Sequence, residues 1–291
     1  MEDLRVVYES RNRRQCSDRA LVLASVQIPY ELVDDGQSCA IVVPAQFSPR
    51  AVEELRLYED ENPPARPRPR RRVVYHDALP GVIGYVIVVC AVAWMAGYSV
   101  FGHDWFSAGR VDGSLIRAGE WWRTITALTL HADVRHLLGN LIFGVFFGIF
   151  AGRLLGSGVS WLAVIIAAAL GNTANTLLLD SMHRSIGAST AVFAALGILA
   201  GYVWHARLMA QDRWPTRLGP VVGGIALLMF TGTGDENTDI GAHLMGFVCG
   251  FATGMVLTLL GRMPAPIRVQ FIAGGFALGI VAVAWTAALQ G

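Results

Sequence analysis

Hydrophobic and polar positions divide this chain into two parts of different character. From about residue 72 onward, long apolar runs alternate with short polar breaks, whereas the earlier residues mix charged and apolar positions. Seven runs approach the length of about twenty residues that crosses the hydrocarbon core of a bilayer. They cover Leu79–Phe101, Leu137–Ala151, Val159–Leu179, Ile186–His205, Leu218–Thr231, Ile240–Leu260 and Val269–Leu289. The pattern predicts an all-α polytopic membrane bundle over residues 77–291, with the short second and fifth runs borrowing flanking polar residues.

The first 62 residues predict a small soluble α+β domain in the order βαββα. Asp35-Gly36 is a hairpin signal between two strands, and Ser17 and Ser48 are candidate N-caps of the two helices. No catalytic set of residues occurs in this part, which favours a cytosolic accessory or regulatory domain. Residues 63–76 follow as a Pro/Arg-rich linker, because alternating proline favours extended polyproline II.

Composition agrees with a membrane protein. The hydrophobic share is 54%, only 15% of residues are charged, and the mean hydropathy is +0.47, all far from a soluble globular chain. Four scattered cysteines do not suggest a disulfide framework or a zinc site. The first residues contain no signal-peptide apolar region, so we expect insertion to depend on later segments.

Arginine placement predicts the orientation. The run Arg66 to Arg72 precedes the first apolar block, and such a run usually marks the cytoplasmic side, with nucleic-acid binding the less favoured alternative. With the N-terminus inside, the remaining loop arginines are also biased inward. The long outer segment 102–135 contains "GEWWRTITALTL", whose tryptophans suit a membrane interface, and we expect a partly embedded hairpin there.

Polar side chains inside apolar surroundings are costly and mark function by default. His136 and Asn140 share one helix face, Ser189 lies in "GASTAVF", and His243 lies in "GAHLMGFVCGFATG". Under the predicted topology all of them lie near the outer ends of their spans, at a common depth. A hydroxyl, an imidazole and a pair of further donors are the groups that acyl transfer requires.

Small residues recur every fourth position around His243. Ala242, Gly246, Gly250 and Gly254 form this stripe, which lets a neighbouring helix approach closely. His243 lies beside the stripe and is expected to face the same neighbour. Each feature also has a purely structural interpretation. A lone histidine at a membrane interface is often hydrogen-bonded packing, and the hydroxyl of a lone serine often bonds to a carbonyl of its own helix.

The motifs "WWR", "HADVRHLLGN", "GAST" and "AHLMGFVCG", in this order, resemble those of the rhomboid family of intramembrane serine proteases. The likeness covers about residues 79 to 290 and implies a six-span core with one C-terminal span added. It implies that Ser189 is the nucleophile and His243 the general base, with no cofactor or metal. His136, Asn140 and the backbone amide of Ser189 would bind the oxyanion. The positions that would shape the site are His131, Trp122, Arg123, Phe193, Gly187, Gly246 and Gly250.

Two positions depart from the family pattern. Thr190 follows the serine where glycine is common, and it either crowds the site or adds a hydroxyl. Phe193 replaces a common tyrosine, so an aromatic face for His243 survives without the phenolic hydroxyl. The resemblance implies single-pass transmembrane proteins in the bilayer as substrates, cut near the outer face.

Three alternatives remain beside this interpretation. "GTGD" at 232–235 formally matches intramembrane aspartyl proteases, which need a second aspartate inside a facing span. The nearest candidate, Asp180, ends its span next to a loop, and "GTGDENTD" is better explained as an outer loop. A zinc site from His131, His136 and His243 lacks a neighbouring carboxylate. The remaining alternative is a catalytically inactive rhomboid-like protein that binds membrane clients, and the sequence does not set the oligomeric state.

Overall fold

The computed structural model describes residues 3–63, 76–178, 183–209, 222–223, 226, 239–260 and 265–290. Contacts divide the chain into two units, residues 1–71 and 72–291. The predicted linker at 63–76 and the apolar run Leu218–Thr231 lie largely outside the described residues, as does the "GTGD" stretch.

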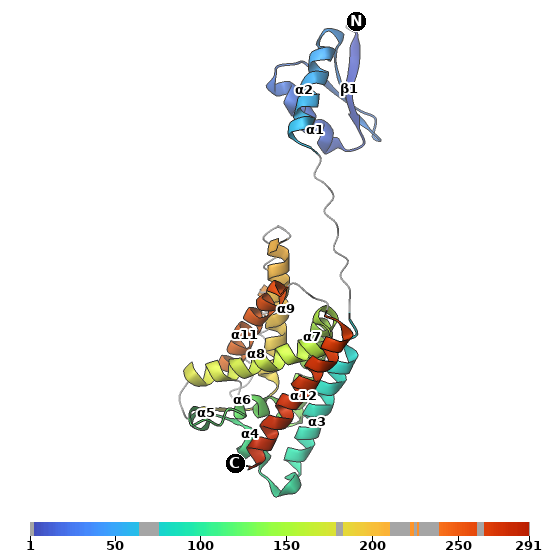
Figure 1. Ribbon diagram of the computed structural model, residues 1–291. Helices are drawn as coiled ribbons and strands as arrows, with labels where there is room; N and C mark the ends of the chain where they lie inside the picture. The colour runs from blue at the N-terminus through green and yellow to red at the C-terminus, as the bar shows by residue number, and fades with distance from the viewer. Residues whose placement is uncertain are drawn as a thin grey trace. The chain divides into compact units, whose positions relative to one another are not determined.

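The N-terminal unit is a three-stranded antiparallel sheet with two helices (Figure 1). Its elements are β1 (Leu4–Ser10), α1 (Arg13–Ser25), β2 (Glu31–Asp34), β3 (Cys39–Pro44), the 3₁₀ turn η1 (Ala45–Phe47) and α2 (Ser48–Glu61). The central strand is β3, and its buried Ile41 and Val43 pack with Leu23 of α1 and Leu55 of α2. The predicted α+β class of this region is therefore confirmed.

Both helices of this unit begin earlier than their candidate caps predict. Asn12 caps α1 by accepting from the Arg14 N–H, and the Ser17 hydroxyl instead donates to the Arg13 carbonyl inside the helix. Ser48 is the first residue of α2 and follows η1, so no side-chain cap is used there. Ser17 and Ser48 as N-caps are thus wrong, because a serine hydroxyl is also tolerated within a helix when it bonds back to a carbonyl.

Six helices among the described residues are long and apolar enough to cross a membrane. They are α3 (Leu79–Gly97), α7 (Val134–Leu155), α8 (Ser157–Leu178), α9 (Ser189–Met209), α11 (Ile240–Leu259) and α12 (Ile267–Gln290). The short second run gains length by taking in polar flanking residues, as expected, since α7 includes His136 and Arg153. The chain is an integral membrane protein with a mainly helical fold.

The segment between α3 and α7 folds as short helices and turns. It consists of η2 (Val100–Gly102), α4 (Trp105–Gly109), β4 (Val111–Asp112), α5 (Gly113–Arg117), α6 (Arg123–Thr126) and η3 (Ala127–Thr129). Residues 123 to 131 are all buried, and Trp285 of α12 donates to the Thr129 hydroxyl at 3.1 Å. We refer to residues 102–133 as the outer hairpin, after the side of the membrane that the arginine pattern predicts for it. The C-terminus of α12 lies at this end of the bundle (Figure 1).

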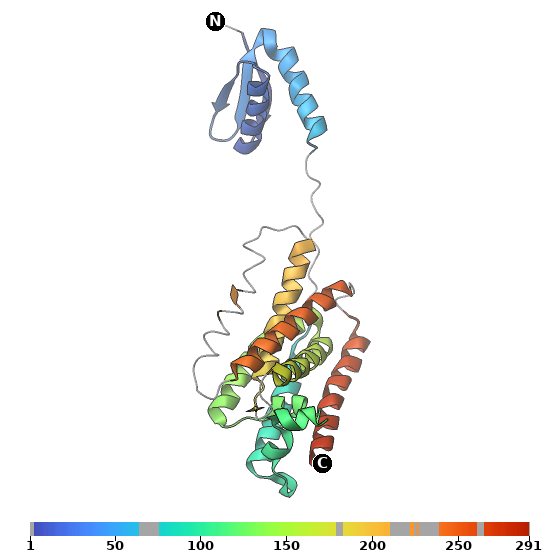
Figure 2. The same ribbon diagram turned by 90° about the vertical axis from the view of Figure 1, so that its left-hand side faces the viewer.

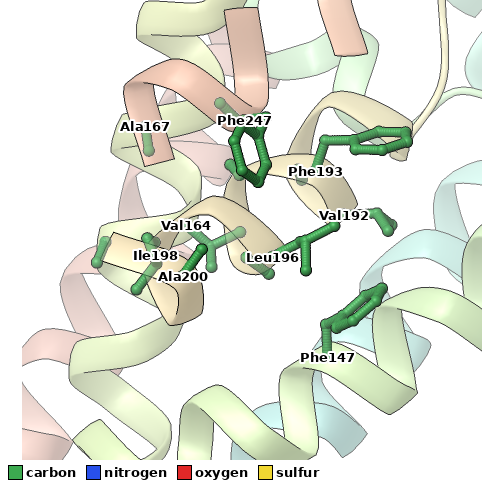
Figure 3. Packing of buried hydrophobic residues seen from close by; sticks show 14 of the residues in the cluster. Phe147, Val164, Ala167, Val192, Phe193, Leu196, Ile198, Ala200 and Phe247 are labelled. Carbon is green, nitrogen blue, oxygen red and sulfur yellow. The ribbon is translucent and has the colours of Figure 1, made fainter. Parts of the chain in front are cut away.

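Helices α8, α9 and α11 enclose the main apolar core. Figures 1 and 2 both place α9 and α11 side by side, and Figure 3 shows Phe193, Leu196 and Ile198 of α9 with Phe247 of α11 and Val164 of α8 in this core. Half of the buried α9 residues in this core are alanines. Small side chains let the three helix axes approach closely, and this sets where the residues at the helix ends lie.

Candidate active site

Ser189 is the first residue of α9, and the chain enters the helix through a glycine with a positive φ. Gly187 has a φ of +134°, which side-chain-bearing residues rarely adopt. A Cβ built on Gly187 would lie 2.7 Å from His136 Nε2 and 3.5 Å from Ser189 Oγ. The imidazole of His136 and the hydroxyl of Ser189 therefore flank the same point, and only glycine leaves it open.

The start of α9 differs from the expected span. The apolar run begins at Ile186, but the helix begins at Ser189, because Gly187 is not helical and the first helical bond is from the Val192 N–H to the Ala188 carbonyl. The N–H groups of the first helical residues have no partner inside a helix. Ser189 thus presents both its hydroxyl and its backbone N–H at the N-terminal end of α9, and the side chain is half-buried.

His131 fastens the segment before Ser189 to the outer hairpin. Its Nε2 accepts from the Ala188 N–H at 3.5 Å, and the neighbouring Gly187 N–H donates to the Ala127 carbonyl at 2.9 Å. Burial lowers the pKa of His131 to about 4, with a further contribution from nearby His136, so the ring is neutral and can accept. The rings of His131 and His136 meet edge to face, 5.1 Å apart.

Helix α7 carries the two expected oxyanion donors one turn apart. Asp133 caps it by accepting from the His136 N–H at 2.8 Å, and this fixes the first turn, so that His131 precedes the helix. Asn140 is 7% exposed, and its Nδ2 has no hydrogen-bond partner within the described part of the chain. The main-chain carbonyl oxygen of Asn140 accepts a hydrogen bond from the Tyr85 hydroxyl at 2.8 Å. Asn140 thus holds a free donor in a buried position.

His243 lies on α11 against the helix that begins with Ser189. Its ring stacks on Phe193 with centroids 4.6 Å apart and an interplanar angle of 27°. The side chain is buried, Nδ1 has no hydrogen-bond partner among the described residues, and His136 lies within electrostatic reach. Phe193 is one helical turn beyond Ser189, so the stacking brings the imidazole to the Ser189 end of α9.

A seam of glycines explains how closely α9 and α11 approach. We define the α9–α11 seam as Gly246, Gly250 and Gly254 of α11 with Thr190, Ala194 and Ile198 of α9. A Cβ on any of the three glycines would overlap the carbonyl oxygen of the facing α9 residue. Gly197 and Gly201 of α9 are covered in the same way by Phe247 and Phe251 of α11.

Thr190 belongs to this seam. It is 3% exposed, and a Cβ on Gly246 would lie 3.0 Å from its Cγ2 methyl. The methyl therefore fills space between the two helices, next to the backbone of Gly246.

Trp122 and Arg123 act within the outer hairpin. Arg123 is buried, pairs with Glu120 at 2.7 Å, and donates to the carbonyls of Ser107 at 2.8 Å and Arg110 at 3.1 Å. Trp122 packs against the cluster that contains Trp105, Leu130 and Trp285. These contacts hold the hairpin together.

Sequence reasoning missed two polar connections near Ser189. Strand β4 pairs with β5 (Arg184–Ser185), and the Arg184 guanidinium contacts the buried Asp112 carboxylate at 3.0 Å. Asp239, just before α11, contacts His183 and Asn175. The sequence does contain a signal for Asp239, because an aspartate directly before an apolar run is a common helix N-cap. The interpretation of "GTGDENTD" as an outer loop instead made Asp239 the last residue of that loop.

The described residues contain no group of three or more His, Cys, Asp or Glu side chains that could hold a metal ion. Nothing in the described geometry gathers His131, His136 and His243 with a carboxylate ligand.

Comparison with known proteins identifies the class to which this fold belongs. Residues 118–260 match the model of the Rhomboid domain. The chain is 33% identical over 146 residues to Rhomboid-like protease 1 of Toxoplasma gondii, covering 49% of this chain and 49% of that protein. It is 32% identical over 151 residues to Rhomboid protease GluP of Bacillus subtilis (strain 168), covering 52% of this chain and 29% of that protein.

A third relative is matched over most of its length. The putative rhomboid protease YdcA of Bacillus subtilis (strain 168) is 28% identical over 175 residues, 58% of this chain and 85% of that protein. The chain thus spans half or less of the length of the first two relatives. It is a polytopic membrane protein with a rhomboid domain, and it belongs to the rhomboid family.

Proposed function

We propose that this protein is an intramembrane serine endopeptidase that cuts transmembrane segments of other membrane proteins. Ser189 is the nucleophile and His243 the general base. The observation that carries this proposal is the meeting of three elements at the start of α9: the half-buried Ser189 hydroxyl, His136 across Gly187, and His243 stacked on Phe193.

The chemistry is acyl transfer in two halves. The Ser189 hydroxyl oxygen bonds to the carbonyl carbon of the peptide, while its proton passes to the His243 imidazole. The imidazolium then returns this proton to the leaving amine as the C–N bond breaks, which leaves an acyl ester on Ser189. Water attacks the ester with the imidazole again as base, and the acid product and the free hydroxyl result.

Three donors are available for the negative charge that develops on the carbonyl oxygen. They are the Ser189 N–H at the first turn of α9, the His136 imidazole, and the Asn140 amide whose Nδ2 has no partner among the described residues. Donors fixed in a site of low dielectric stabilise such charge without reorganisation, and each typically contributes on the order of 10²–10³ in rate.

The proposed orientation has the N-terminal domain in the cytoplasm and the active site opening to the outer face. The run Arg66 to Arg72 before α3 supports this orientation through the positive-inside rule. Ser189 and His131 lie at the end of the bundle that carries the outer hairpin, so water would reach the site from that side. The relatives named as rhomboid proteases support proteolysis, and transmembrane proteins are accordingly the proposed substrates.

The proposal is tested on purified protein with a fluorogenic transmembrane peptide. We expect Ser189→Ala and His243→Ala each to lower turnover to background while the melting temperature stays near that of the wild type. The double variant should be no slower than either single variant, because the two groups act as a unit. Near-normal turnover by Ser189→Ala would refute the serine-protease mechanism.

A non-catalytic membrane-client binder is the second candidate, favoured by Thr190 in the place of the common glycine. A fluorophosphonate probe separates the two functions, because it labels an activated serine. Labelling of the wild type at Ser189, absent in Ser189→Ala, supports the enzyme. A folded wild type that binds transmembrane peptides and takes up no label supports the binder.

A further inference from the structure

Asp239 lies directly before α11, one helical turn ahead of His243. Its Oδ1 accepts from the Ala242 N–H at 2.9 Å, so Asp239 is the N-cap of α11. The His243 N–H donates to the Asp239 carbonyl at 3.1 Å. Asp239 therefore fixes the first turn of the helix on which His243 stands.

The same carboxylate also contacts two other parts of the molecule. Its Oδ2 lies 2.7 Å from Nε2 of His183, and Asn175 Nδ2 donates to both carboxylate oxygens at 3.2 Å. An N-cap needs only one acceptor oxygen, so these contacts do more than cap a helix. We call Asn175, His183 and Asp239 the outer latch.

Burial and charge make the outer latch a defined arrangement. Asn175 is 3% exposed, and the side chains of His183 and Asp239 are 20% and 14% exposed. Burial alone would raise the pKa of Asp239, but the Ala242 N–H and nearby His183 outweigh it and lower the pKa, so the carboxylate is ionised. A carboxylate only accepts, so His183 donates from Nε2.

The three latch residues come from the elements that surround the candidate site. Asn175 is on α8, one turn beyond Gly171, whose Cβ position would meet the backbone of Gly246 in α11. His183 directly precedes β5, six residues before Ser189, and its carbonyl accepts from the Gly113 N–H of the outer hairpin at 3.0 Å. The outer latch thus joins the start of α11 to α8 and to the segment that leads into Ser189.

We infer that the outer latch positions His243 relative to Ser189, an inference that rests on the proposed protease function. The α9–α11 seam sets the distance between the two helices, but its glycines offer no polar group to stop α11 from sliding or turning about its axis. The outer latch supplies that restraint at the end of α11 nearest His243. A misplacement of a reacting group by about 1 Å can cost on the order of 100-fold in rate.

The test uses full-length protein in detergent, with the transmembrane peptide and the fluorophosphonate probe. Asp239→Ser keeps a good N-cap but cannot reach His183 and Asn175. His183→Ala removes the partner from a segment outside the helices and leaves the cap intact. We expect each variant to lower kcat about 10- to 100-fold and to slow labelling of Ser189 in parallel, with KM changed less than about twofold.

The double variant and a matched control complete the design. Because the two residues act through one contact, Asp239→Ser with His183→Ala should be no slower than the slower single variant. Asp104→Ser is the control, since exposed Asp104 caps α4 by accepting from the Ser107 N–H at 3.0 Å and touches no latch residue. It should retain wild-type kcat.

The outcomes separate the two proposals. If the wild type neither cleaves nor takes up label, the protease function fails. If the wild type does both, and either Asp239→Ser or His183→Ala keeps wild-type kcat and labelling rate, the positioning role of the outer latch is refuted. Independent, multiplying losses in the double variant would also refute it.

Discussion

The two sides of Ser189 are built differently. On the α11 side, the α9–α11 seam is closed by glycines whose Cβ positions overlap the facing carbonyls, and Thr190 and Phe193 are almost fully buried. On the α7 side, His136 is half-buried and lies close to Gly187, and Asn140 keeps a donor without a partner among the described residues. The α11 side is closely packed, whereas the α7 side has a hydrogen-bond donor without a partner among the described residues.

This difference assigns different tasks to the two sides. Dense packing of small residues fixes where His243 stands against the serine helix, since lipid provides no hydrophobic force to hold helices together and close contact must do so. A buried donor left without a partner costs free energy, which is typical of groups held ready for a ligand or a transition state. Changes to the donors on the α7 side should therefore alter rate, and changes to the small residues of the α9–α11 seam should alter stability.

The largest expected effect is on the α7 side. We expect Asn140→Ala to slow cleavage by on the order of 10²–10³ while the melting temperature changes little, because Nδ2 makes no hydrogen bond within the described part of the chain. Turnover of the peptide and thermal unfolding in one detergent measure both quantities. His136→Ala should behave alike, with Ser189 still open to chemical labelling. A fully active variant would remove that residue from the site.

The next effect is on the α9–α11 seam. Gly250→Ala would push a methyl group into the Ala194 carbonyl, so we expect a loss of about 1–3 kcal/mol and a lower melting temperature. Gly279→Ala on α12 is the matched control, because a Cβ there meets nothing within 4 Å. An equal melting temperature for both variants would contradict the distinction between a closed seam and an open helix face.

A smaller effect is expected at Thr190. Thr190→Gly removes the methyl that faces Gly246 and adds backbone freedom, so stability should fall by about 1 kcal/mol while cleavage remains measurable. Thr190→Ser removes only the methyl and should lose less. A sharp rise in turnover for Thr190→Gly would instead mean that Thr190 blocks the site, and the protein would then be a binder.

The smallest expected effect concerns the contact between Asp112 and Arg184, which ties the outer hairpin to β5. Hydrogen bonds from Ser114, together with Arg184 and the Leu115 N–H, lower the pKa of Asp112 to about 2 against burial. The stability it contributes is complete above about pH 4 and is lost as the pH falls from there to about 2. We expect Asp112→Asn to flatten the fall in melting temperature between pH 5 and pH 3. An unchanged slope would show that Asp112 does not couple folding to protons.

Periodicity predicted the membrane helices well because lipid leaves few choices. A long apolar run in a bilayer must satisfy its own backbone, so α3, α8, α11 and α12 begin and end within about four residues of their predicted limits. The start of α9 was predicted less well, since the apolar run includes Ile186 and Gly187, which are not helical. The hydropathy of a residue carries no information on its backbone angles, so the positive φ of Gly187 could not be predicted from the apolar run.

The candidate site divides in the same way. Ser189, His243, His136 and Asn140 were recognisable as polar residues in apolar surroundings, and Phe193 as the aromatic partner of His243. Asp239, His183 and Asn175 were not, because each is an ordinary polar residue at the edge of an apolar run, separated from the others by up to 64 positions. Contacts between residues so far apart in the chain produce no periodic pattern in the sequence.

The sequence by itself determined that this chain enters a membrane, where its helices run, and which polar residues are set in apolar surroundings, because these depend on local composition and spacing. Only the tertiary structure decided that Gly187 lies between His136 and Ser189, that Thr190 faces Gly246, and that Asp239 joins α11 to α8 and to the segment before Ser189. Those relations arise when helices distant in sequence pack at van der Waals contact, and no local pattern encodes the angle at which they meet.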